Sequence, residues 1–292
     1  MMKKFYLLLI AVFLLVICVY LFFCGLAGWE KNPRVVARLT LDRIQAVTDH
    51  NNVIASNTGE KTNIIFLHHS VGNHLIENGS VRELLGEQGY DFWDHNYNWI
   101  GLRDPQGNFR DYSYNVPGDN TDTIGFRDIF AQKLYDLPVN TLSGLFQHEV
   151  IILKSCFPNS NVDSKANLQE RKKMYLQIRD VMAAHQDKLF IILTSPPLNP
   201  AETDLRTAAR ARQVSDWLVS EEFLSGLSNV FVFDYYSLLA EDDSDAVDFN
   251  MLREEYREGT DSHPIKNADE EIAPFFVEFI IKTIKTFQGS QN

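Results

Sequence analysis

Five short apolar segments alternate with longer segments of helical pattern along most of the chain, and this alternation limits the possible fold more than any other feature. The expected strands span residues 63–67, 91–95, 149–154, 189–195 and 230–235. The expected helices span residues 81–88, 123–135, 167–186, 205–224 and 268–287. Strands that alternate with helices of this length form a parallel sheet covered on both faces. The sequence therefore predicts an α/β fold, with three layers (α/β/α) around a five-stranded parallel sheet.

Polar residues follow three of the expected strands. The segments are HHSVG after the first strand, KSCFPNSN after the third and TSPPLNP after the fourth. Open α/β sheets keep their functional sites beyond the carboxyl ends of their strands. We therefore expect the site at this edge of the sheet.

The amino-terminal part of the chain has the pattern of a membrane anchor. An uncharged apolar run from residue 5 to about residue 27 follows Lys3 and Lys4. A helix of this length crosses the ~30 Å hydrocarbon layer of a bilayer. The basic residues on its amino side place that end in the cytoplasm. Small residues at 25–27 leave cleavage by a signal peptidase as the alternative, although the run is longer than an ordinary signal peptide requires.

The chain is thus expected to have three parts. Residues 1–28 form a signal anchor or transmembrane segment, residues 29–60 a connector, and residues 61–292 one extracytoplasmic domain, either periplasmic or extracellular. With 27 basic and 39 acidic residues, the formal net charge is −12. This balance disfavours nucleic acid and anionic surfaces as partners.

Residues suited to acyl transfer occur at the expected edge. A serine hydroxyl attacks an acyl carbon when a base removes its proton, a third group orients the base and donors bind the oxyanion. Ser70 stands at a strand-to-helix turn, where backbone N–H groups point outward. His263 is the candidate base, in the polar loop GTDSHPIKN, and Asp261 lies two positions before it. Capping of the following helix is the alternative role for Ser70.

A cysteine nucleophile is the less favoured alternative. Cys18 and Cys24 lie in the apolar run, which leaves Cys156 alone in the domain, without a disulfide framework. The simpler interpretation of Cys156 is a small buried residue.

Taken in chain order, the polar segments resemble the four sequence blocks of the SGNH (GDSL-type) hydrolases. HHS at 68–70 stands where that family has GDS after its first strand, and DSHP at 261–264 resembles the last block. NVPGDNT at 115–121 resembles the second block, and ILKSCFPNSN at 152–161 occupies the place of the third. The resemblance covers roughly residues 63–287. It implies a flavodoxin-like α/β/α fold and a serine esterase or acyltransferase activity.

The resemblance also implies roles for particular residues. Ser70 corresponds to the nucleophile and His263 to the base. The backbone N–H groups of Ser70 and Gly118 and the side chain of Asn159 correspond to the oxyanion donors, with Asn161 as the alternative to Asn159.

The chain departs from the family pattern in three places. His69 replaces the usual acidic neighbour of the serine, and the third block lacks the Gly-x-Asn-Asp form. The last block has Asp-x-His where the family has Asp-x-x-His, and Thr260 stands three positions before His263. Asp261 is therefore expected to orient His263 from a different turn position, and a loop carboxylate without a role is the alternative.

The histidines near Ser70 raise the alternative of a metal site. Neighbours in a strand point to opposite faces, so only one of His68 and His69 can easily join His74 and a third ligand. The sequence has no HExxH or comparable spacing. We expect His68 to be a packed structural residue and His69 to help shape the pocket, with no metal and no cofactor.

The leading hypothesis is a membrane-anchored, extracytoplasmic serine esterase or O-acyltransferase that acts on a small-molecule or carbohydrate ester. Carbohydrate is favoured by the aromatic residues of the irregular section 90–122, because aromatic faces with polar edges stack on sugars. The same rings alternatively cap the hydrophobic core. Two other functions stay open: an inactive polysaccharide-binding module of the same fold, and a metal-dependent hydrolase using His68, His69 and His74.

Overall fold

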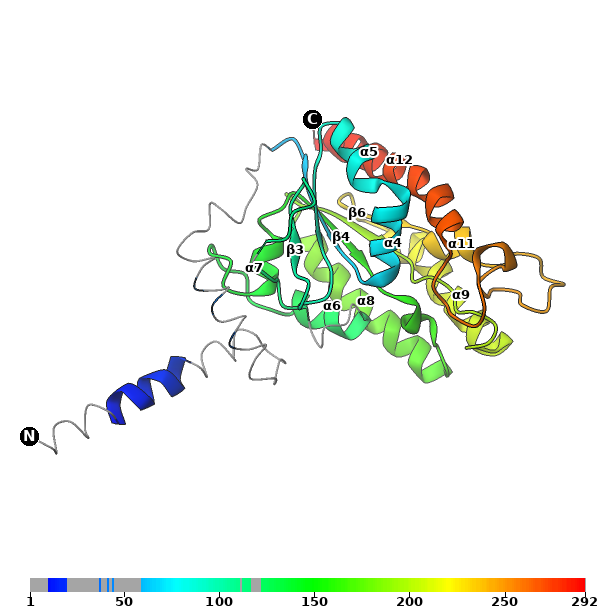
Figure 1. The fold of residues 1–292 in the computed structure, drawn as a ribbon, viewed down its shortest axis with the longest axis horizontal. Helices are drawn as coiled ribbons and strands as arrows, with labels where there is room; N and C mark the ends of the chain where they lie inside the picture. Colours follow the sequence, from blue (N-terminus) through cyan, green and yellow to red (C-terminus); the bar gives the residue numbers. More distant parts are fainter. Residues whose placement is uncertain are drawn as a thin grey trace, which may run out of the picture.

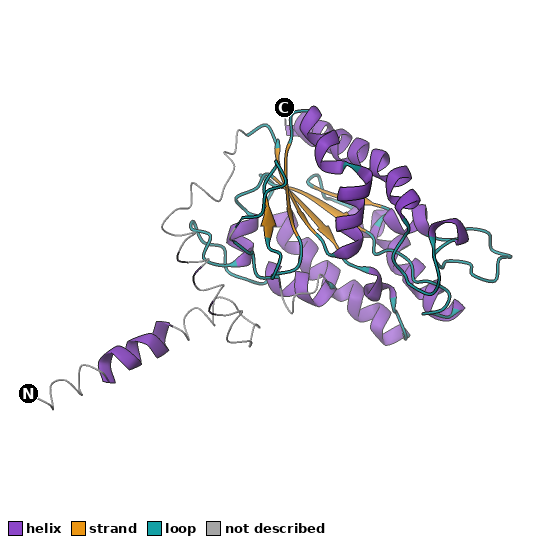
Figure 2. Cartoon of the chain, viewed as in Figure 1, coloured by secondary structure: helices purple, strands orange, loops and turns teal. Residues whose placement is uncertain are grey.

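The computed structural model describes residues 10–19, 37, 41, 44, 59–110, 112–116 and 122–291. From residue 59 onward these residues form three layers, with a sheet between two layers of helices (Figures 1 and 2). The strands are β1 (Asn63–Leu67), β2 (Asp91–His95), β3 (Leu102–Arg103), β4 (Val150–Lys154), β5 (Leu189–Leu193) and β6 (Val230–Phe233). They lie in the order β3-β2-β1-β4-β5-β6. The predicted α/β class and its five predicted strands are confirmed.

The prediction that the sheet has only five strands, all of them parallel, is wrong. β1 pairs in parallel with β2 and β4, and β5 pairs in parallel with β4 and β6. β3 pairs antiparallel with β2, so the sheet of the described residues is mixed and has six strands. β3 has only two residues, too few to show an alternating pattern. Gly101, with φ at +80°, supplies a left-handed conformation just before β3.

Helices cover both faces of the sheet. They are α4 (Ser70–Gly79), α5 (Val81–Glu87), α6 (Thr123–Phe130), α7 (Thr141–Leu145), α8 (Lys165–Ala184), α9 (Leu205–Leu218), α10 (Glu221–Leu224), α11 (Tyr235–Leu239) and α12 (Lys266–Gln291), with 3₁₀ turns η2 (Phe157–Ser160) and η3 (Glu254–Tyr256). Ile65 and Ile151 pack in the core that includes α6, α8 and α9. Ile64 and Ile152 pack in the core that includes α4, α5 and α12. Successive strand side chains point to opposite faces, so continuous apolar strands fill both cores.

The contact between α4 and α12 positions the site. The two helices lie side by side on one face of the sheet (Figure 1). A Cβ on Gly79 would lie 2.2 Å from the Cβ of Ala273, so only glycine permits this approach. Asn78 Nδ2 also donates a hydrogen bond of 2.8 Å to Asp269 Oδ2. The start of α4 and the loop before α12 are therefore held at the same edge of the sheet.

Little of the amino-terminal region is described. Residues 10–19 are helical, and before residue 59 only three further positions are described. Within the residues described, no helix has the length and apolar character needed to cross a bilayer. The expected anchor (1–28) and connector (29–60) thus lie largely outside the described residues and stay predictions.

Candidate active site

Ser70 is the first residue of α4, directly beyond the carboxyl end of β1. The residue at the cap position of α4 is His69, and its side chain makes no capping hydrogen bond. Ser70 Oγ lies 2.7 Å from His263 Nε2, although 193 positions separate the two residues. The half-exposed hydroxyl of Ser70 is therefore directed at the predicted base instead of capping the helix.

The loop before α12 brings His263 and Asp261 together. His263 Nδ1 lies 2.7 Å from Asp261 Oδ1, and the backbone N–H of His263 donates to the same oxygen at 3.1 Å. A carboxylate only accepts hydrogen bonds, so Nδ1 carries the hydrogen. The lone pair of Nε2 is then directed at the Ser70 hydroxyl. The Asp-x-His spacing allows this contact because the Asp261 carboxylate turns back toward His263 and accepts hydrogen bonds from both its backbone N–H and its ring Nδ1.

The carboxylate of Asp261 is well solvated. Its side chain is 63% exposed, against 27% for His263. Partial burial alone would raise the pKa of Asp261, but the hydrogen bonds from the ring and backbone of His263 outweigh it and lower that pKa. Asp261 is therefore ionised at neutral pH, while water screens its charge.

Three further side chains surround the Ser70–His263 pair. Cys156 Sγ lies 3.8 Å from Ser70 Oγ. The ring of Phe157 meets the His263 ring edge-on at 4.8 Å between centroids, and the ring of His74 lies 5.5 Å from it. Burial, and then the charge of His263, lower the pKa of His74. These neighbours were not predicted, although the pairing of β1 with β4 brings the segments after both strands together.

The predicted oxyanion donors are placed only in part. Gly118 lies outside the described residues. Asn159 is buried in η2, where its Oδ1 accepts from Thr123 Oγ1 at 3.1 Å and from Arg171, and its Nδ2 donates to Ser195 Oγ at 2.9 Å. An amide group carries two such hydrogens, so a donor role for Asn159 uses the second one. Asn161 is exposed, and its carbonyl accepts from Arg171 at 3.3 Å.

The three histidines considered as metal ligands have separate environments. His68 Nε2 lies 2.9 Å from Asp94 Oδ2, and the His69 ring stacks on Tyr97 at 4.0 Å. His74 instead lies against His263. Burial, with smaller contributions from nearby charged groups, lowers the pKa of His69 to about 3, so this ring is neutral at physiological pH. Among the described residues, no group of three histidine, cysteine or acidic side chains is arranged to hold a metal ion.

A small cavity has Cys156 in its wall. Its volume is about 170 Å³, comparable with the ~150 Å³ of a cavity that holds benzene. The described residues that line it include Thr123, Cys156, Asn159 and Arg171. Cys156, which contacts Ser70, thus forms part of the cavity wall.

No family model matches the chain, and no curated protein matches its sequence. Solved structures with a similar fold include a GDSL-like lipase from Bacteroides thetaiotaomicron, with 10% identity and a TM-score of 0.45 over 84% of this chain and 97% of that one. They also include a proposed acylhydrolase from Bacteroides fragilis, with 11% identity and a TM-score of 0.49 over 87% of this chain and 100% of that one.

Proposed function

We propose that this chain is a serine hydrolase of ester bonds. The main support is a continuous series of hydrogen bonds. Ser70 Oγ lies 2.7 Å from His263 Nε2, and His263 Nδ1 lies 2.7 Å from Asp261 Oδ1. This order of nucleophile, base and orienting carboxylate is the one that activates a serine.

The reaction has two steps. His263 Nε2 takes the hydroxyl proton as Ser70 Oγ bonds to the ester carbonyl carbon, and the imidazolium then protonates the departing alkoxide. The acyl group stays on Ser70. Water, deprotonated by the same nitrogen, then attacks the carbonyl carbon of the acyl-enzyme. The bond from that carbon to Ser70 Oγ breaks, the imidazolium returns its proton to Oγ, and the acid is released. In an O-acyltransferase a sugar hydroxyl takes the place of that water.

The oxyanion of each tetrahedral intermediate needs hydrogen-bond donors. We assign this role to the backbone N–H groups of Ser70 and Gly118 and to the second amide hydrogen of Asn159. Ser70 supports this assignment by its place at the first position of α4, where the N–H has no partner within the helix.

The substrate proposal is an ester of a short acyl group on a carbohydrate or another small alcohol. The volume of the cavity beside Cys156 supports a short acyl group. The aromatic section divides into buried rings and exposed rings. Trp93, Tyr112 and Tyr114 belong to the core, whereas Trp99 is 69% exposed and stacks on Tyr97. The exposed rings favour a carbohydrate substrate. The buried rings instead belong to the hydrophobic core, the alternative role considered for this section.

We place the domain outside the cytoplasm, anchored by residues 1–28. This part of the proposal rests on the apolar run after Lys3 and Lys4.

Neither rival function has comparable support. An inactive binding module does not need the Ser70–His263 contact, and the histidines that a metal-dependent hydrolase would use have other partners.

A fluorophosphonate probe tests the proposal on the full-length chain in detergent micelles. We expect one probe per chain, mapped to Ser70 by peptide mass spectrometry, and no labelling of Ser70→Ala. Ser164→Ala is the matched control, because Ser164 also stands at a helix start but caps α8 by accepting from Asn167 N–H. Failure of the folded chain to react, or labelling at another residue, would refute the proposal.

A further inference from the structure

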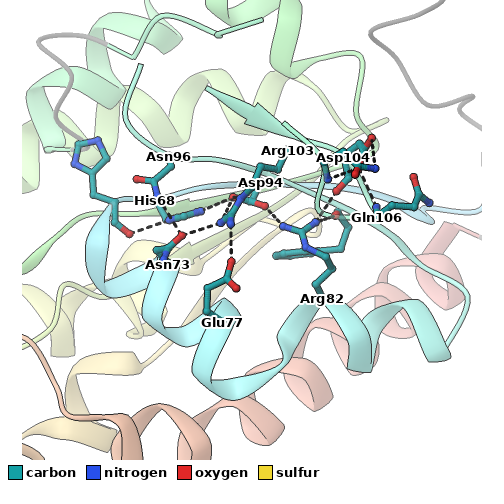
Figure 3. Close-up of polar contacts among 12 residues, drawn as sticks. His68, Asn73, Glu77, Arg82, Asp94, Asn96, Arg103, Asp104 and Gln106 are labelled. Atoms are coloured by element: carbon teal, nitrogen blue, oxygen red, sulfur yellow. Dashed lines mark hydrogen bonds and ion pairs between the residues drawn. The ribbon is translucent and has the colours of Figure 1, made fainter. Parts of the chain in front are cut away.

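A largely buried network of polar and charged side chains surrounds Asp94 and includes His68, two positions before Ser70 (Figure 3). At its centre Asp94 of β2 is fully buried. Its carboxylate accepts hydrogen bonds from His68 Nε2 at 2.9 Å, from Arg103 Nε at 2.9 Å and from Arg82. Burial alone would raise the pKa of Asp94, but the hydrogen bond and charge of His68 and the two guanidinium groups hold that pKa well below its usual range. Asp94 is therefore a carboxylate.

The arginines are themselves held in place. Arg82 also donates to the carbonyl oxygens of Phe92 and Asp104, each at 2.7 Å. Arg103 also donates to Asn73 Oδ1 at 2.8 Å, and it forms an ion pair with Glu77 at 2.5 Å. The network thus joins β2 and β3 to the helices that follow β1. Asp94 has little freedom to move within it.

His68 connects this network to the nucleophile turn. Its Nδ1 lies 2.8 Å from the backbone carbonyl oxygen of His69, on the side of the ring away from Asp94. A carbonyl and a carboxylate both accept hydrogen bonds and donate none, so each ring nitrogen of His68 carries a hydrogen. The ring is fully buried. It therefore acts as a fixed donor to the His69 carbonyl.

The His69 carbonyl belongs to the peptide unit that contains the Ser70 N–H. The same oxygen also accepts from the backbone N–H of Asn73 at 2.8 Å, the first hydrogen bond of α4. A trans peptide unit is planar, with its C=O and N–H pointing in opposite directions. Two donors on the carbonyl therefore fix the direction of the Ser70 N–H on the other side. Donation to a carbonyl also polarises the peptide unit and strengthens its N–H as a donor.

We propose that His68, held by Asp94, is a positioning residue that aims the Ser70 N–H at the oxyanion. The inference rests on the proposed function, since it needs an acyl-transfer reaction at Ser70. This role accounts for the HHS sequence. The first histidine donates to the carbonyl oxygen of the His69–Ser70 peptide unit, and the serine that follows supplies both the N–H of that unit and the attacking hydroxyl.

Two neutral variants of His68 separate this role from a merely structural one. In His68→Asn the side-chain Nδ2 takes roughly the place of ring Nδ1, so the bond to the His69 carbonyl is kept and the bond to Asp94 is lost. In His68→Gln the amide reaches toward Asp94, and the bond to the His69 carbonyl is lost. Both variants replace the ring by a neutral amide. They differ in which contact survives.

The full-length protein is assayed with an aryl acetate, with active sites counted by fluorophosphonate labelling. We expect His68→Gln to lower kcat about 10²-fold, the scale of a misplaced catalytic group or a lost oxyanion donor, with KM within about twofold. We expect His68→Asn to stay within about tenfold of the unmodified protein. An aryl boronic acid, which forms a tetrahedral anion on Ser70, should bind His68→Gln more weakly by the same factor as kcat falls.

Controls keep the outcomes distinct. His148→Asn and His148→Gln change another fully buried histidine with two side-chain partners, Tyr114 and Asn63, and should lower the melting temperature without changing kcat. Asp94→Asn loosens His68 without altering it, and it provides a second test by the same boronate assay if His68→Gln does not fold.

Equal kcat values for the two His68 variants, or a lower value for His68→Asn, would overturn the inference. So would unchanged boronate affinity in Asp94→Asn. Failure of the unmodified protein to react with the fluorophosphonate would instead refute the proposed function.

Discussion

Asp261→Asn should slow the reaction only moderately, because a single oxygen of Asp261 serves two donors. Asp261 Oδ1 accepts both the backbone N–H and the ring Nδ1–H of His263. An asparagine at this position has one oxygen, and its NH₂ group cannot accept from the backbone N–H. The asparagine oxygen therefore takes the place of Oδ1. The ring keeps its hydrogen on Nδ1 and its lone pair toward Ser70.

The expected loss is then electrostatic alone. In a triad with a buried aspartate, the same substitution costs roughly 10⁴-fold because it imposes the wrong tautomer. Here the tautomer is kept, and what is lost is the attraction between the carboxylate and the imidazolium. At about 4 Å this attraction is worth about 1 kcal/mol in water and about 4 kcal/mol near a protein surface. With Asp261 63% exposed, the lower end applies, and we expect kcat to fall about tenfold.

The assay compares Asp261→Asn with Asp261→Ala, using an aryl acetate and active sites counted by labelling. The alanine variant loses the acceptor as well as the charge, so its kcat should fall well below that of the asparagine variant. A loss near 10⁴-fold in Asp261→Asn would show that the amide adopts the opposite orientation, and equal losses in the two variants would show that the shared oxygen does not hold the ring.

Four other substitutions have outcomes that follow from the structure. Ser70→Ala and His263→Ala should each reduce kcat to the same floor in the aryl acetate assay, because members of one catalytic unit are not additive. Gly79→Ala should lower both the melting temperature and kcat, since its Cβ would lie 2.2 Å from that of Ala273. Burial raises the pKa of Asp269 to about 7, so the contribution of this one carboxyl group to native stability falls as pH rises from about 4 to 7. The gap in free energy of unfolding between Asp269→Asn and the unmodified protein, measured in urea, should therefore shift in favour of the variant over that range.

The five parallel strands of the sheet could be predicted because most of their residues are buried, on both faces of the sheet. A strand such as β4, with five buried residues, reads as a continuous apolar run whose ends are marked by polar segments. β3 has no such signal, since its two residues owe their conformation to pairing with β2 across the turn at Gly101. Short edge strands depend on their neighbours more than on their own sequence.

Ser70, His263 and Asp261 could be predicted to meet because their local sequences resemble blocks of known order, and the structure brings all three together. The role of His68 could not be predicted in this way. The sequence feature that pointed to this role was Asp94, a charged residue within the strand DFWDH, because a charge buried in a strand requires partners. Arg103 is a partner because β3 pairs with β2, whereas Arg82 reaches Asp94 from helix α5, and neither arrangement can be read from the strand itself.

The position of His263 depends on groups that no catalytic motif contains. An exposed carboxylate is a weak anchor, so Asp261 cannot by itself hold the ring toward Ser70. The loop is instead fixed by Asn199, from the TSPPLNP segment after β5, whose Nδ2 donates to the Asp261 carbonyl at 2.9 Å and whose N–H donates to Ser262 Oγ at 2.8 Å. Ser262 is fully buried, whereas both of its neighbours are partly exposed.

These contacts explain why three strand ends contribute polar segments to the proposed site, which has one nucleophile and one base. The segment after β1 supplies Ser70, the segment after β4 packs Cys156 and Phe157 against Ser70 and His263, and the segment after β5 holds the loop that carries His263. Beyond that loop, α12 is held against α4 by the Gly79 contact and the Asn78–Asp269 hydrogen bond. The base is thus anchored on both sides of its loop by buried groups, which leaves the Asp261 carboxylate to orient a ring whose backbone is already placed.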